Sequence, residues 1–188
     1  LDRKTVYFVV PKPLHRHEFL LGKFLGLAVT LTVLVVLMAA ILGIVLGFAG
    51  GRHDLVLVRA ELLVLFELLL VTAVALLFSS FSSPYLSAMF TGSLWVIGRN
   101  SAELRAFATG KKMADTPLGT LLDGVAKVLP DFHLFYVSGA SLGGETPVSI
   151  HDSFVGWGYV GEAGLYAALY GSLCLVLAMV LLARRDFT

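Results

Sequence analysis

The chain has 188 residues, of which 57% are hydrophobic and 14% are charged, and its mean hydropathy is +0.87. This composition is far more apolar than that of a water-soluble domain, so it predicts a membrane protein. The formal net charge of +1 gives no basic field that would attract nucleic acid, which excludes that class of partner. Cys174 is the only cysteine, which excludes a disulfide frame within the chain.

Residues 1–23 place a cluster of charges in front of a long apolar segment. Pro11 and Pro13 favour an extended entry, and Glu18 suits the positive end of a helix that starts nearby. We expect a short amphipathic helix that lies on the cytoplasmic face before the chain turns into the bilayer. Such an element is either a passive anchor or a lever pressed by a soluble partner. Because Leu1 is not an initiator methionine, we also expect the chain to be a fragment.

Two long apolar segments follow. Residues 24–50 contain no ionisable side chain, and as a helix they would cross the hydrocarbon core with length to spare. A polar turn separates them from residues 56–78, the second predicted transmembrane helix. Small residues recur at helical spacing along and just before the first segment, which would let helix backbones approach closely, within one subunit or across a dimer seam. They are Gly22, Gly26, Gly43, Gly47 and Gly51.

Glu67 lies near the middle of the second predicted span. An ionised carboxylate at that depth costs several kcal/mol and is rarely exposed to lipid. One interpretation makes Glu67 part of a polar pathway or a conformational latch. The other keeps it protonated, or bonded to a hydroxyl such as that of Thr72 or to a neighbouring helix. Both interpretations place Glu67 toward the helix bundle or a cavity.

The second half of the chain is more varied. Residues 79–84 end the second helix at Pro84, which lacks an amide donor. Residues 85–98 form an apolar segment that is short for a span, so it either crosses the membrane or re-enters it. Residues 99–160 are predicted as an extracytoplasmic loop, with an interfacial amphipathic helix over residues 117–128. A last span over residues 163–183 follows, and a short tail, residues 184–188, ends the chain.

These elements predict an all-α bundle of about four transmembrane helices. Positively charged flanks concentrate in cytoplasmic loops, so both ends of the chain are expected on the cytoplasmic side. Both ends lie on one side only if the number of crossings is even, and four crossings meet this condition. Four basic residues then fall on the extracytoplasmic side, against the same rule, and a re-entrant third segment is the alternative: Arg99, Arg105, Lys111 and Lys112.

The sequence contains none of the common catalytic patterns. His17 and Glu18 are not followed by the second histidine of a zinc protease, and no glycine-rich P-loop is present. His15 and His17 are two residues apart, so on a helix they point in different directions and do not form a metal pair. We therefore predict no catalytic residue, metal site or cofactor in this chain.

Four stretches together resemble one family. VPKPLHRHEFLLGKFLG (residues 10–26) looks like the coupling segment of type-2 ATP-binding-cassette (ABC) exporter permeases, especially the branch associated with multicopper-enzyme maturation. LLFSSFSSPYLSAMFTGSLWVIG (residues 76–98) is similar to that branch's fourth-span exit and fifth span. LPDFHLF (residues 129–135) is similar to the loop before its last span. LLARRDFT (residues 181–188) is similar to its terminal arginine and aspartate motif.

The resemblance implies a permease subunit of the bacterial inner membrane that lacks two preceding spans. It implies that ATP is bound by a separate cassette ATPase subunit, and that two permease subunits pair across a path for an exported substrate. The ATPase would dock near residues 11–23 and move this segment as a lever. The residues assigned to coupling are Pro11, Pro13, Arg16, Glu18, Gly22 and Lys23.

The rival interpretation is a membrane protein that transports nothing. It would be a scaffold or assembly factor whose polar loop, residues 99–152, binds an extracytoplasmic partner. The composition fits either protein, since both need the same apolar spans in contact with membrane lipid.

Overall fold

The computed structural model describes residues 16–49, 55–101, 124, 129–135, 139–140, 148–149 and 156–183. Its long helices are α1 (Arg16–Phe48), α2 (Leu55–Phe81) and α6 (Trp157–Ala183). A shorter helix, α3 (Pro84–Arg99), follows α2 in the chain. A 3-10 turn, η2 (Phe132–Phe135), precedes a two-residue hairpin of β1 (Gly139–Ala140) and β2 (Val148–Ser149). The strands are antiparallel, with Gly139 opposite Ser149.

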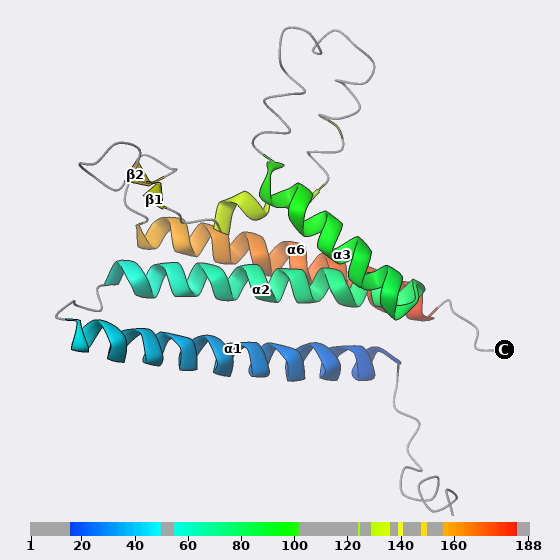
Figure 1. Cartoon of the computed structure of the whole chain (residues 1–188). Helices are drawn as coiled ribbons and strands as arrows, with labels where there is room; N and C mark the ends of the chain where they lie inside the picture. Colours follow the sequence, from blue (N-terminus) through cyan, green and yellow to red (C-terminus); the bar gives the residue numbers. More distant parts are fainter. Residues whose placement is uncertain are drawn as a thin grey trace, which may run out of the picture.

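Three of these helices are long and apolar enough to cross a membrane: α1, α2 and α6. Figure 1 shows them side by side with nearly parallel axes, α1 running opposite to α2 and α6. Leu20, near the start of α1, packs in one cluster with Leu76 and Ala178, near the ends of α2 and α6. The start of α1 therefore lies at the same end of the bundle as the ends of α2 and α6. The expected all-helical fold is thus confirmed, with three helices, rather than about four, that are long and apolar enough to cross a membrane among the described residues.

The third apolar segment forms a helix but a short one. Ser83 is the N-cap of α3, and Pro84 occupies its first turn, where a missing amide donor costs nothing. With 16 residues, α3 is about 24 Å long at the usual helical rise, less than the roughly 30 Å hydrocarbon core. It slants across α2 and α6 in Figure 1, and it is not among the helices long enough to span.

The boundaries differ from the sequence-based expectations in three places. Residues 16–48 form one continuous helix, so within the described residues no separate surface helix precedes the first span. Arg99 is the last residue of α3 rather than part of a loop. The last long helix begins at Trp157, six residues before the predicted start at Ala163. The predicted helix over residues 117–128 lies outside the described part of the chain, apart from Gly124.

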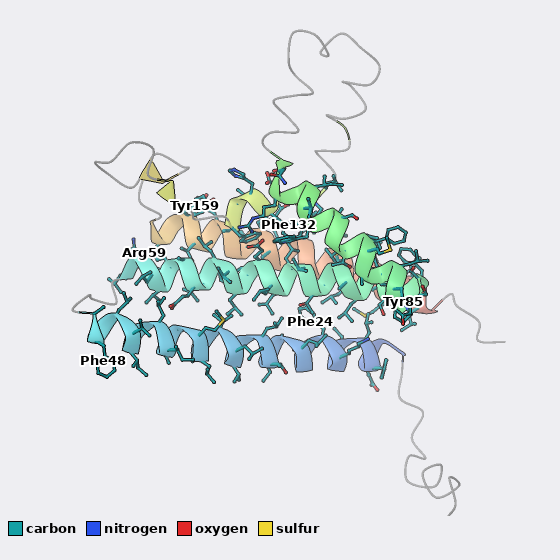
Figure 2. The ribbon with its side chains drawn as sticks, viewed as in Figure 1. Phe24, Phe48, Arg59, Tyr85, Phe132 and Tyr159 are labelled. Atoms are coloured by element: carbon teal, nitrogen blue, oxygen red, sulfur yellow. The ribbon has the colours of Figure 1, made fainter. Side chains whose placement is uncertain are left out.

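The core has two clusters along α2 and α6. One contains Leu63, Leu70 and Ala163 together with Phe132 and Phe135 of η2. The other contains Ala73, Val74, Cys174 and Ala178 with Leu20 of α1. Figure 2 shows η2's Phe132 between α3 and the α2–α6 pair, whereas Phe48 points away from the bundle. The interior is therefore built mainly by α2, α6 and η2.

Three of the five glycines expected to bring α1 close to another helix do not do so within the described residues. A Cβ added at Gly22, Gly26 or Gly47 would meet no atom within 4 Å. Among the described side chains of α1, Leu20 alone is buried. The packing interpretation of these glycines is therefore wrong for contacts within the described part of the subunit.

Candidate functional site

Glu67 lies on the buried stripe of α2. Leu63, Leu70 and Val74 share this stripe at helical spacing, and the exposed fraction of Glu67 is 8%. The side chain faces protein, as both sequence interpretations required. A carboxylate on such a stripe, in a helix of this length and apolarity, needs partners that compensate for its desolvation.

Both partners of Glu67 come from α3. Trp95 Nε1 and Arg99 Nη1 each donate a hydrogen bond of 2.8 Å to the same carboxylate oxygen, Oε1. Trp95 and Arg99 are four residues apart and therefore share one face of α3. The Arg99 guanidinium also lies over the Trp95 ring, 5.4 Å from its centroid. Together these residues form the Glu67–Trp95–Arg99 cluster, a partly buried ion pair beside an aromatic ring.

The sequence anticipated one of these three residues. Thr72, the suggested hydroxyl partner, instead donates to the carbonyl of Leu68 on its own helix. Arg99 was assigned to the extracytoplasmic loop, because the change in composition at that residue suggested the end of the apolar segment. The four-residue spacing of Trp95 and Arg99 indicates that they share one face of a helix. Only the packing of α3 on α2 identifies Glu67 as their partner.

The end of α3 is held in place by the LPDFHLF stretch. Gly98 lies so close to this stretch that an added Cβ would come within 2.4 Å of the Pro130 carbonyl oxygen and 2.5 Å of the Phe132 ring. Ser101 donates a 2.6 Å hydrogen bond to Asp131. The contacts of Gly98 and Ser101, which flank Arg99, therefore fix the position of Arg99.

The same stretch is fixed to α6 by two tyrosines. The amide of Asp131 donates to the Tyr166 hydroxyl at 2.9 Å. The Tyr159 hydroxyl donates to the Leu134 carbonyl at 2.6 Å. Because η2 contacts α2, α3 and α6, it links the short helix to the long ones. The two tyrosines therefore have a specific structural role.

A cavity of about 350 Å³ adjoins the cluster. Its walls combine the charged pair with apolar side chains of α2 and one turn of α3, and they are formed by Val64, Glu67, Leu68, Val71, Thr91, Gly92, Trp95 and Arg99. Arg99 and Glu67 retain side-chain exposed fractions of 30% and 10%. The ion pair therefore borders a space large enough for a small ligand.

The residues assigned to coupling are not part of this cluster. Pro11 and Pro13 lie outside the described residues, and Arg16 begins α1. Glu18, Gly22 and Lys23 are exposed in its first turns. Lys23 lines a second cavity together with Ser79 and Pro84. The four of these residues that are described therefore lie at the end of the bundle, whereas Glu67 lies in its interior.

A metal centre finds no support among the described residues, where no group of three or more His, Cys, Asp or Glu side chains could hold a metal ion. In comparisons with known proteins, no family model, no curated protein and no solved structure matches the chain. What the chain does must therefore be inferred from its own residues and geometry.

Proposed function

We propose that this chain is a membrane-spanning permease subunit of an ABC exporter, driven by a separate cassette ATPase and paired with a second permease subunit. The resemblance of the four sequence stretches motivates the proposal, and the three long helices are compatible with it. In this proposal the start of α1 and the end of α6 face the cytoplasm of a bacterial cell, where the ATPase binds.

The observation that carries the proposal is the continuity of α1 from Arg16 to Phe48. A helix without a break transmits a displacement of its first turns along its whole length. The first turns are also accessible, since Glu18 and Lys23 are exposed. An ATPase that moved these turns would tilt α1 against α2, a rigid-body change of the kind that switches transporters. This lever differs from the hinged surface helix expected from the sequence.

The test combines hydrolysis with a distance measurement. The full-length subunit is purified from its native membrane with any ATPase that accompanies it. Spin labels are placed on cysteines introduced at Phe48 and Tyr85, both exposed, in a background in which Cys174 is replaced by alanine. We expect trapping with ATP and vanadate to shift the distance between the labels, because α1 tilts and α3 follows α2.

The double variant Arg16→Gln and Glu18→Gln should keep its rate of ATP hydrolysis within twofold of the parent protein but lose the distance shift. Glu162→Gln, an exposed carboxylate on α6, is the control and should retain both. An unchanged distance in the trapped parent protein would contradict the lever. Absence of any co-purified ATPase would instead favour the non-transporting scaffold.

A further inference from the structure

The cavity beside the Glu67–Trp95–Arg99 cluster continues toward one end of the bundle. It shares Val71, Thr91 and Gly92 with a second cavity of about 480 Å³, the one that Lys23 and Pro84 line. We call the two cavities together the α2–α3 groove. The groove therefore leads from the end of the bundle where α1 begins to the ion pair in the interior.

The groove also holds an accessible polar atom that the fold does not use. Both donors to Glu67 reach Oε1, so its second oxygen, Oε2, accepts no hydrogen bond from the described residues. This oxygen is also not among the fully buried atoms that lack a partner, which leaves it open to the cavity. The Ser87 hydroxyl also has no partner within the described chain, but its oxygen is fully buried, so it is not available to a ligand.

Unpartnered polar atoms of this kind are unusual. Buried polar groups in proteins almost always have a hydrogen-bond partner, and the cost of leaving one without is larger where no water competes. Several described hydroxyls show the usual solution, since Thr30, Thr72 and Thr91 each donate to the carbonyl four residues earlier. Oε2 of Glu67 has no such partner within the described residues and borders the cavity, so an occupant of the groove can donate to it.

The charges of the groove define the chemistry of that occupant. Glu67 lies ten residues inside the apolar stretch of α2 that starts at Leu57, which is about 15 Å along the helix. The cavity wall carries both an anion, the Glu67 carboxylate, and a cation, the Arg99 guanidinium, and added net charge is costly at this depth. A head group with both charges adds none: its ammonium fits Oε2, and its anionic oxygens fit the guanidinium.

We propose that the α2–α3 groove binds an amphiphile whose head group carries both an ammonium and an anionic group. The apolar walls, Val64, Leu68 and Val71, accept the part of the ligand next to the head group. The site depends on the described contacts alone. If the chain is a permease, as proposed above, this ligand class is its substrate class.

Trp95 provides a direct probe of binding. The chain has two tryptophans, so Trp157→Phe leaves Trp95 as the sole emitter. The full chain in non-ionic detergent is titrated with lysophosphatidylethanolamine, and the fluorescence of Trp95 is followed. We expect a saturable change. Lysophosphatidylglycerol, which is anionic, and a monoacylglycerol, which is uncharged, should need at least tenfold higher concentrations.

A matched pair of glycine substitutions tests the location. A Cβ added at Gly92 or at Gly158 would meet no atom within 4 Å, so a side chain can begin at either position without a collision at its Cβ. Gly92 lines both cavities, whereas Gly158 lines neither. Gly92→Leu should therefore weaken binding at least tenfold, and Gly158→Leu should leave it unchanged.

A second pair tests the chemistry. Glu67→Gln and Arg99→Gln should each weaken binding of the zwitterion at least tenfold, whereas Glu61→Gln, a carboxylate outside the groove on the same helix, should not. If Glu67→Gln does not fold, Gly92→Leu still decides the site, since it leaves the ion pair intact.

The outcomes separate the possible sources of the ligand. Binding of the lysolipid but not of phosphoethanolamine alone would assign the groove to a membrane lipid, and equal binding of both would assign it to a soluble zwitterion. Equal responses to the zwitterionic and anionic lysolipids would overturn the proposal, as would a response that survives Gly92→Leu. Because no ATPase is present, these results are independent of the test of the permease.

Discussion

Two helices of similar apolarity that are both long enough to cross a membrane, α1 and α2, have different surroundings. None of the most apolar window of α1 is buried within the chain, whereas 33% of that of α2 is. Phe48 on α1 is 91% exposed, and Leu63 on α2 is fully buried. High apolarity therefore directs a helix into the membrane without determining whether protein or lipid surrounds it.

The difference between the two helices follows from side-chain shape. Without a solvent that drives apolar groups together, helices in lipid associate through close packing and internal polar contacts. The contact of α2 with α6 has both. The Phe66 ring lies against Gly164, and Gly171 approaches Ala73. The Arg59 guanidinium lies over the Trp157 ring, 5.1 Å from its centroid. Gly22, Gly26 and Gly47 of α1 meet no such complementary surface among the described residues.

Gly98→Ala tests the closest contact of the inner region and should have the largest effect. The added Cβ would collide with the backbone at Pro130 as well as the Phe132 ring, so the chain must shift. We expect a loss of about 3 kcal/mol in the free energy of unfolding, the upper range for overpacking. Gly47→Ala on α1 is the control and should be neutral or slightly stabilising, because its Cβ meets nothing. Equal effects in denaturant titrations of the detergent-solubilised protein would refute the distinction.

Glu67→Gln and Arg99→Gln test whether the ion pair contributes to the same region. Each single variant should lose about 2 kcal/mol, less than for a fully buried pair because Arg99 is partly exposed. In a double-mutant cycle the coupling between them should be about 1 kcal/mol. Unfolding of the two single variants and the double variant provides the measurement. Strictly additive losses would mean that the hydrogen-bonded pair carries no interaction energy of its own.

Leu20→Ala tests the contact of α1 with the core and should have the smallest effect. Leu20 is 5% exposed and packs with Leu76 and Ala178 at the end of the bundle, where the site can collapse or fill with lipid. We expect a loss of about 1 kcal/mol, below the usual range for a buried leucine. Leu25→Ala, at a position 60% exposed on the same helix, should change stability by less than about 0.5 kcal/mol. A larger loss at Leu25 would show that a further surface covers α1.

Local sequence features predicted the elements well where the physics is local. The uncharged stretch before Arg52 and the one before Arg184 gave two of the three long helices, and Glu67 was identified because a carboxylate is costly in any apolar segment. The break at Pro84 was confirmed, since proline acts through its own ring and missing amide. Segment boundaries were less accurate: Trp157 and Tyr159 were placed ahead of the last helix, but they form its first turn.

The sequence by itself determined that the chain enters a membrane and that Glu67 needs a partner there, because the transfer energies of side chains add up along a segment without reference to the rest of the fold. Only the tertiary structure decided which partner. Trp95 and Arg99 reach Glu67 because α3 slants back over α2 and Gly98 docks on the LPDFHLF stretch, a meeting of residues about thirty positions apart. Such contacts depend on the complementary shapes of several elements at once, and no single segment encodes them.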